Sequence, residues 1–204
     1  MQALISFLFF WLGLTCFVTA HPVTYKGGFA TSAIQTRNDT TVYLNHSISQ
    51  KKSYGVQFIS LSDTNERLLF LTSNRLLKRW YFFDAQANIY TTTSLGYNID
   101  DKTITPCIFT KIDAENRYFY TDLTLTLMKP NTRIYSKLTT RIGGAPYKHT
   151  YSSISAWFMI EATYISYDSS TVFLMPIYRG FYKTYLWELG YNGKHFLAHI
   201  MVHF

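Results

Sequence analysis

Alternating hydrophobic and polar residues recur along most of the chain and predict β-strands. The clearest run spans 118–128, where leucines alternate with Asp and Thr. A period of two places successive side chains on opposite faces of a strand. The alternation resumes over 132–140 after Pro130-Asn131, a pair typical of turns. The two runs are therefore expected to form a hairpin.

A second hairpin is predicted at the C-terminal end of the sequence. Residues 181–189 and 195–204 alternate on either side of Tyr191-Asn192-Gly193-Lys194. Asn-Gly favours a type I′ turn, because both residues tolerate positive φ. The apolar face of the last run is expected to enter the core, and it consists of Phe196, Ala198, Ile200, Val202 and Phe204.

Three histidines, His195, His199 and His203, share the other face of that run and are expected to face solvent. On a helix this spacing would bring three imidazoles together. On a strand, side chains four residues apart are separated by about 13 Å, because the rise is about 3.3 Å per residue. That distance is too long for one metal ion, so no metal site is predicted.

The rest of the chain also has strand composition. Residues 63–83 fit either an amphipathic helix or two strands around Ser73-Asn74, and two strands are favoured. Strands spaced by about 10 to 14 residues predict an all-β fold, a single-domain antiparallel β-sandwich or barrel of about ten strands. Further strands are expected at 41–49, 54–61, 88–93, 103–112, 155–167 and 171–177. Breakers are expected at 100–101, 143–146, 168–170 and 179–180.

The N-terminal segment is expected to be a secretory signal peptide. Residues 1–20 carry no charged side chain, are almost all apolar from 3 to 18, and end in Val18-Thr19-Ala20. This run of about 16 residues is shorter than the roughly 20 that a membrane-spanning helix needs, so cleavage before His21 is favoured over an anchor. Residues 21–204 are then one β-rich extracellular domain, and the predicted localisation is secreted.

Secretion changes how cysteine and asparagine are interpreted. Cys107 is the only cysteine after residue 20, so it is either a buried thiol in a monomer or the intermolecular link of a disulfide dimer. Its apolar neighbours favour burial. Two sequons, at Asn38 and Asn45, are expected to carry N-glycans and to place residues 38–47 at the surface.

The chain is basic, with 19 Lys and Arg against 12 Asp and Glu and a net charge of +7. Outside the cell such a charge attracts glycans, anionic membrane surfaces or acidic proteins, whereas nucleic acid is not an expected partner of a secreted protein. A basic and aromatic contact surface is predicted at Arg75, Lys78, Arg79 and Trp80, and at Arg133, Lys137 and Arg141, which share one strand face.

Catalytic signatures are missing from the sequence. It contains no Gly-x-Ser-x-Gly, no His-Glu-x-x-His and no phosphate-binding glycine loop, and its carboxylates are scattered. We therefore expect neither an enzyme nor a cofactor.

In outline the chain resembles three groups of secreted β-proteins. Its size is similar to that of lipocalin-type barrels, although it lacks their Gly-x-Trp near residue 21. Its basicity and its stretch 179–203 are similar to those of actinoporin-type cytolysins. The signal followed by one short domain, with the segment 76–93 around Trp80, resembles small secreted proteins of piroplasm (Babesia/Theileria-type) parasites with Trp-centred β modules. The last resemblance implies a host-interaction protein and assigns no residue a role.

The leading functional hypothesis is a secreted, non-enzymatic binding protein that engages an extracellular protein or glycan. One alternative is a membrane-binding or pore-forming protein, because basic residues lie beside aromatic ones. A second alternative is a lipocalin-like carrier of a small hydrophobic ligand, which requires a barrel with an internal cavity.

Overall fold

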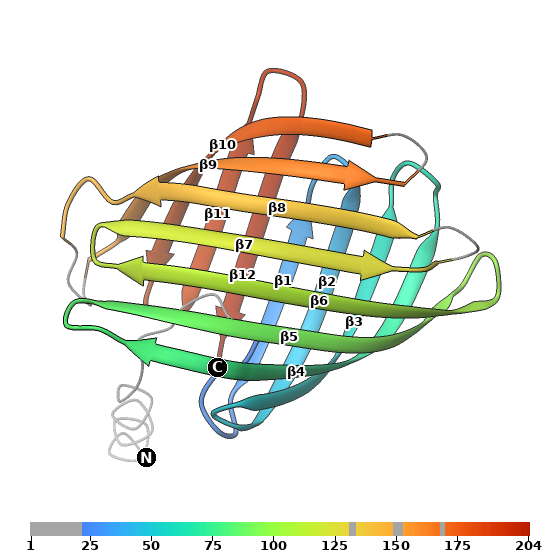
Figure 1. The fold of residues 1–204 in the computed structure, drawn as a ribbon, viewed down its shortest axis with the longest axis horizontal. Coiled ribbons are helices and arrows are strands. Elements are labelled where there is room, and N and C mark those ends of the chain that lie inside the picture. Colours follow the sequence, from blue (N-terminus) through green and yellow to red (C-terminus); the bar gives the residue numbers. More distant parts are fainter. Residues whose placement is uncertain (1–21, 131–133, 149–152, 168–169) are drawn as a thin grey trace, which may run out of the picture.

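The protein is a closed antiparallel β-barrel (Figure 1). A computed structural model describes residues 22–130, 134–148, 153–167 and 170–204. Within these residues there are twelve strands, more than the ten or so expected. They are β1 Phe29–Gln35, β2 Asp39–Ser49, β3 Lys52–Leu61, β4 Arg67–Tyr81, β5 Ala85–Asn98, β6 Thr103–Asn116, β7 Phe119–Met128, β8 Tyr135–Gly144, β9 Ser155–Ser166, β10 Ser170–Tyr182, β11 Tyr185–Tyr191 and β12 Phe196–His203.

Each strand pairs with its neighbours in sequence, and β1 closes the ring against β12. At the seam Ala33 lies opposite Ile200, and the backbones of Phe29 and Phe204 exchange hydrogen bonds in both directions. Closure satisfies the backbone polar groups of every strand and leaves no open sheet edge. The β1–β2 hairpin and every second hairpin after it lie at one end of the barrel, here called the hairpin end. The opposite end, where both β1 begins and β12 finishes, is called the termini end.

The predicted alternation is present, but it is inverted with respect to solvent. Leu123 on β7 is 44% exposed, whereas Asp122 beside it is buried. On β12, Ile200 is 53% exposed and Met201 is buried. The expectation that Phe196, Ala198, Ile200, Val202 and Phe204 enter the core is therefore wrong. They face outward, while His199 and His203 point into the barrel. The prediction assumed that water lies outside the fold.

Several strand boundaries also differ from expectation. Residues 67–81 form one strand, β4, and Ser73-Asn74 pair with both neighbouring strands instead of turning. A β-bulge between Leu76 and Lys78 shifts the register near its end. The strand does not end at residues 179–180, because β10 continues to Tyr182 and the turn follows at Lys183, whose φ is 53°.

The predicted Asn-Gly hairpin between β11 and β12 is confirmed. The Asn192 side-chain oxygen accepts hydrogen bonds from the backbone N–H groups of Lys194 and His195. Gly193 has φ of +88°, and Asn192 is not among the described residues with positive φ. The turn is therefore held by a side-chain cap rather than by the expected pair of left-handed residues.

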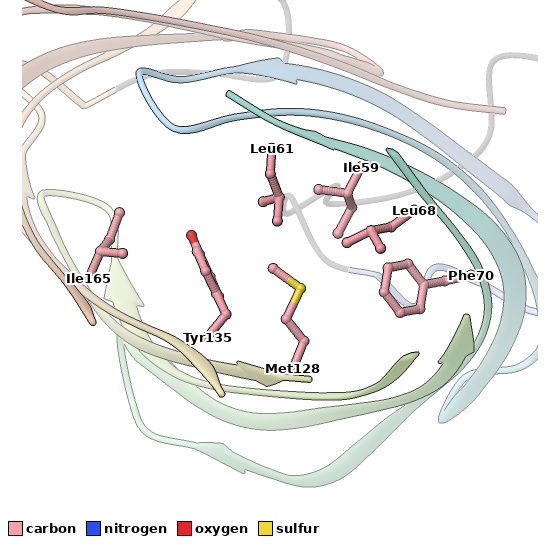
Figure 2. Close-up of a cluster of buried hydrophobic side chains, with 7 residues drawn as sticks. All are labelled: Ile59, Leu61, Leu68, Phe70, Met128, Tyr135 and Ile165. Atoms are coloured by element: carbon pink, nitrogen blue, oxygen red, sulfur yellow. The ribbon is translucent and has the colours of Figure 1, made fainter. Parts of the chain in front are cut away.

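Apolar side chains fill part of the barrel interior near the hairpin end (Figure 2). Residues from β3 and β4 point there toward residues from β7, β8 and β9. This hairpin-end cluster consists of Ile59, Leu61, Leu68, Phe70, Met128, Tyr135 and Ile165. A second cluster lines the wall from β7 to β12, and it consists of Tyr120, Trp157, Met159, Met175, Ile177 and Leu197.

Among the described residues, no helix has both the length and the apolar character needed to cross a bilayer.

Candidate functional site

The outer surface of the barrel is an apolar band. Outward-facing Leu, Ile and Val occur on strands all around the ring, and many are more than 40% exposed. Water-soluble monomers rarely expose apolar patches larger than a few hundred Å². The band includes Val42, Leu44, Val56, Leu69, Leu71, Leu95, Ile108, Ile112, Leu123, Ile160, Val172, Leu174, Leu189 and Ile200.

Exposed aromatic residues gather where the strands end. Membrane barrels carry two aromatic girdles of this kind around an apolar band of about 25 Å, because aromatic rings favour the membrane–water interfaces. At the termini end they are Phe29, Tyr54, Trp80, Tyr81, Tyr118, Phe119, Tyr185 and Phe204. At the hairpin end they are Tyr97, Tyr164, Tyr191 and Phe196.

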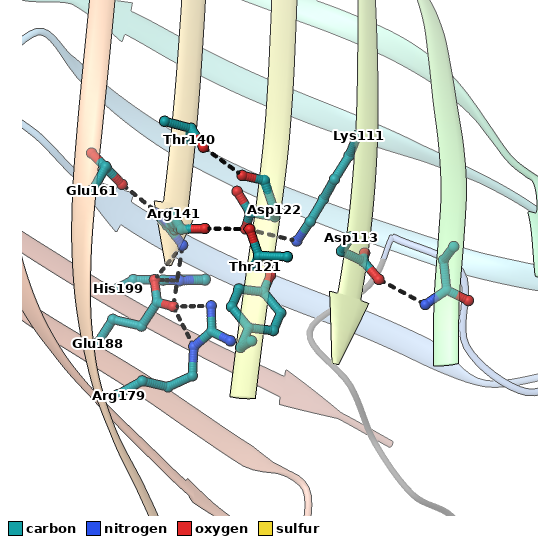
Figure 3. A network of polar contacts seen from close by, with 12 residues as sticks. Lys111, Asp113, Thr121, Asp122, Thr140, Arg141, Glu161, Arg179, Glu188 and His199 are labelled. Carbon is teal, nitrogen blue, oxygen red and sulfur yellow. Dashed lines mark hydrogen bonds and ion pairs between the residues drawn. The ribbon is translucent and has the colours of Figure 1, made fainter. Parts of the chain in front are cut away.

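Charged side chains point into the lumen and form a network along one wall (Figure 3). Glu188 on β11 is its centre. Arg179 Nη2 lies 2.6 Å from Glu188 Oε1, and Arg141 Nη1 lies 3.2 Å from Oε2. His199 Nδ1 is 2.8 Å from the same Oε2. Arg141 also binds Glu161, with Nε 2.7 Å from Oε2. Five adjacent strands, β8 to β12, thus each contribute one charged or polar side chain to the network.

The network continues around the lumen through β7, β6, β5 and β4. Tyr120 Oη donates to Asp122 Oδ2 at 2.7 Å, and Lys111 Nζ lies 3.6 Å from the same oxygen. The Arg179 guanidinium lies over the Tyr120 ring, 4.4 Å from its centroid. Further along, the Asn88 amide connects Arg79 to Asp113. Arg79 Nε donates to Asn88 Oδ1 at 2.6 Å, and Asn88 Nδ2 donates to Asp113 Oδ1 at 2.7 Å.

Neutral polar groups occupy the remaining part of the wall. Asn74 on β4 donates to Asn45 and to Ser53, and its oxygen accepts from Thr92. Buried polar groups are tolerated when they are hydrogen-bonded in this way. The interior surface is therefore polar on most strands, which is the reverse of a water-soluble β-barrel.

The lumen contains a cavity of about 270 Å³. Its lining includes Lys111, Asp122, Arg141, Glu161 and His199 from the network, together with residues of the hairpin-end cluster. Pro22, in the segment before β1, also lines it. The arrangement provides an interior compartment for water, ions or small polar solutes.

The predicted contact surface is not one surface. Lys78 and Trp80 lie on the outside of β4, where Lys78 Nζ is 5.8 Å from the centroid of the Trp80 ring, and Arg75 is also exposed. Arg79 follows the bulge and points inward. Lys137 and Arg141 share a face, as predicted, but it is the lumen face. Arg133 lies outside the described residues.

Both sequon asparagines are buried, although they were expected to lie at the surface, whereas Val42 and Leu44 between them face outward. The Asn38 side chain donates to Asp63 Oδ2, and Asn45 points into the barrel. A glycan on Asn45 does not fit inside this fold. Cys107 is a free thiol on the lumen side of β6, packed against the hairpin-end cluster. In that position it cannot reach a second copy of the chain. The predicted signal peptide lies outside the described residues.

Glu188, Arg179, Glu161, Asp122 and Lys111 were not singled out from the sequence, although each is a lone ionisable residue on the less apolar face of an alternating run. His199 was noticed only as one of three evenly spaced histidines that were expected to face solvent. The signal that could have identified them is their place in the two-residue alternation, because each lies one position from an outward-facing apolar residue.

No protein-family model matches the chain, and no curated protein matches it. Two of the solved structures that share its fold are porin structures. One is the KdgM porin in complex with disordered oligogalacturonate, and the other is the KdgM porin. Each has a TM-score of 0.55 and 10% identity, with 87% of this chain and 98% of that chain covered. At this identity the likeness shows the fold alone.

The expectation of a freely secreted protein is wrong. The chain closes into a twelve-stranded barrel whose fold is similar to that of the KdgM porin, and its apolar band would face water in a secreted protein. An apolar band around a closed ring indicates a protein located in a membrane, which favours the membrane-binding or pore-forming alternative over the secreted binding protein.

Proposed function

We propose that this protein is a membrane-embedded β-barrel channel that passes small ions and small polar solutes. The observation that carries the proposal is the combination of a closed ring with an apolar outside and a charged, hydrogen-bonded inside around a cavity. Barrels whose strands alternate apolar-out and polar-in are suited to conduct through the lumen. No step of this function requires a catalytic group or cofactor, so we also propose that the protein is not an enzyme.

The charges of the lumen favour a channel that discriminates only weakly between cations and anions. Its basic and acidic side chains are close to balanced, and they are paired with one another or hydrogen-bonded to amides, so neither sign dominates. The basic set is Arg79, Lys111, Lys137, Arg141 and Arg179, and the acidic set is Asp39, Asp113, Glu115, Asp122, Glu161 and Glu188. A polyanion such as the oligogalacturonate bound by the KdgM porin would need unpaired cations, and here both Arg141 and Arg179 already hold carboxylates. A cavity of about 270 Å³ also limits the solutes that fit in the lumen to small ones.

The test is ion conduction by the purified full chain in a planar lipid bilayer, with protein-free bilayers as the baseline. We expect discrete conductance steps and a cation-to-anion permeability ratio near one. A bilayer that shows no current above baseline with the unaltered protein and with every lumen variant described below would contradict the proposal.

A further inference from the structure

We propose that the hairpin end of the lumen is closed by a gate, formed by an ion pair between opposite walls and by the hairpin-end cluster beside it. The proposal rests on the channel function proposed above and concerns how that channel is regulated.

The ion pair joins two strands that are not neighbours. Lys137 on β8 places Nζ 2.8 Å from Oδ2 of Asp39 on β2. In the closed ring β8 lies six strands from β2 in either direction, so the two residues belong to opposite walls. Among the other ion pairs, Arg141–Glu161 and Arg179–Glu188 connect adjacent strands, and Arg141–Glu188 joins β8 to β11 along one wall. The Asp39–Lys137 pair therefore crosses the path that a solute would take.

The aspartate is held in place for this contact. Thr36 Oγ1, in the β1–β2 hairpin, donates to Asp39 Oδ1 at 2.6 Å. The side chains of Lys137 and Asp39 are 19% and 12% exposed, so both charges are largely removed from solvent. A charge pair in such a place is maintained only while both partners are present, because either charge alone is strongly disfavoured there.

An apolar contact closes the same level of the lumen. Figure 2 shows Leu61 and Ile59 pointing from one wall toward Tyr135 and Met128 on the other. Tyr135 lies on β8 two residues before Lys137, on the same face. The ion pair and the apolar contact thus form one layer, and an apolar constriction of a lumen can stop the passage of water and ions.

The hairpins above this layer are connected across the opening as well. Tyr167 Oη, after β9, lies 3.5 Å from Oε2 of Glu66, before β4. Pro130, after β7, is fully buried, and its carbonyl accepts hydrogen bonds from Thr103 and Thr105. Tyr167 and Glu66 therefore approach each other across the opening above the layer.

One feature indicates a closed state that can open rather than a permanent plug. Within the described residues, no protein group forms a hydrogen bond with Tyr135 Oη, and Tyr135 lines the cavity together with Asp39 and Lys137. A buried hydroxyl without a protein partner gains free energy when water hydrates it. Opening the layer would hydrate this hydroxyl and both charges, which offsets part of the lost apolar contact. The two states are thus closer in free energy than a fully satisfied plug would allow.

The experiment measures conduction and access to Cys107, which packs against the hairpin-end cluster and lines the cavity. A Cys16→Ser background leaves Cys107 as the only thiol. A charged methanethiosulfonate reagent is added to protein in liposomes, and channel open fraction is recorded in bilayers. The variants are Asp39→Asn, Lys137→Gln and the exchange Asp39→Lys with Lys137→Asp. Leu61→Ala thins the apolar layer without touching a charge.

We expect each single charge variant, and Leu61→Ala, to raise both the open fraction and the Cys107 labelling rate at least about tenfold, because removal of one partner destabilises the closed layer. The exchange variant should return both quantities toward the original values. Arg67→Gln is the matched control. It breaks an exposed pair with Asp100 at the same end and should change neither quantity.

The outcomes separate the two proposals. A protein that conducts, but whose open fraction and labelling are unaffected by all four variants, overturns the gate and leaves the channel. An absence of current in every variant, including those with faster Cys107 labelling, overturns the channel function on which the gate rests. Single variants that open the channel without recovery in the exchange variant would show that the pair itself is not the closing contact.

Discussion

At the scale of single residues, the lumen network depends on Glu188. This carboxylate accepts from Arg179 and Arg141 and contacts His199, and its side chain is 1% exposed. Two buried arginine charges are tolerated beside each other only because the negative charge of Glu188 compensates them. The sequence contains this information only as a lone Glu in an alternating run, since its partners lie on other strands.

Replacement of Glu188 by Gln should lower the free energy of unfolding by about 3 to 5 kcal/mol, the usual cost of removing one partner from a buried ion pair. It should also make the channel anion-selective, because Arg141 and Arg179 lose a shared negative charge. Urea unfolding in lipid vesicles and reversal potentials in a salt gradient measure the two effects. Asp100→Asn, in the exposed pair with Arg67, is the matched carboxylate-to-amide control and should have little effect on either. An unchanged reversal potential in a folded Glu188→Gln protein would place Glu188 away from the ion path.

At the scale of elements, neighbouring strands fit together through glycines that face large side chains. Gly180 on β10 lies opposite Trp187 on β11, and a Cβ on Gly180 would collide with the indole ring. The same arrangement pairs Gly96 with Phe70 on the lumen side. Covering a strand glycine with an aromatic ring compensates for its missing side chain.

Gly180→Val should therefore destabilise the barrel by about 1 to 3 kcal/mol, since an overpacked site must shift its neighbours. Adding Trp187→Ala should remove part of this cost, so the double variant should lose less than the sum of the two single variants. Unfolding midpoints for the complete double-mutant cycle measure the coupling. Strict additivity would mean that the ring does not lie over Gly180.

The strands show what could be predicted from local sequence. Period-two alternation identified 118–128 and 195–204 correctly, because it depends only on the geometry of the backbone. It could not indicate which face is inside, because the pattern of Leu125 and Thr126 is the same for a barrel in water and its inverse in lipid. The continuous strand through Ser73-Asn74 was missed, because polar residues at a lumen face resemble a turn.

At the scale of the whole molecule, closure of β1 on β12 brings together groups that are far apart in the sequence. Asp39 and Lys137 are separated by 98 positions, and no spacing rule connects them. The charge network and the candidate gate were therefore beyond sequence reasoning, although Lys137 and Arg141 were correctly placed on one strand face. Their face is the lumen because the ring closes with its apolar side outward.

That outward side should contact lipid, and two tryptophans can test it. Trp187 lies on the outer face of β11, whereas Trp157 is inside, where its indole N–H donates to Ser155 Oγ at 2.7 Å. Single-tryptophan variants, with the other tryptophans replaced by Phe, are reconstituted in vesicles whose acyl chains carry bromine. Bromine quenches only fluorophores that it can touch, so Trp187 fluorescence should fall strongly and Trp157 fluorescence should be nearly unchanged. Water-soluble iodide should quench Trp187 weakly for the same reason. Strong iodide quenching of Trp187, with no effect of brominated lipid, would mean that the apolar band faces water. In that case the membrane location, and with it the channel, would have to be abandoned.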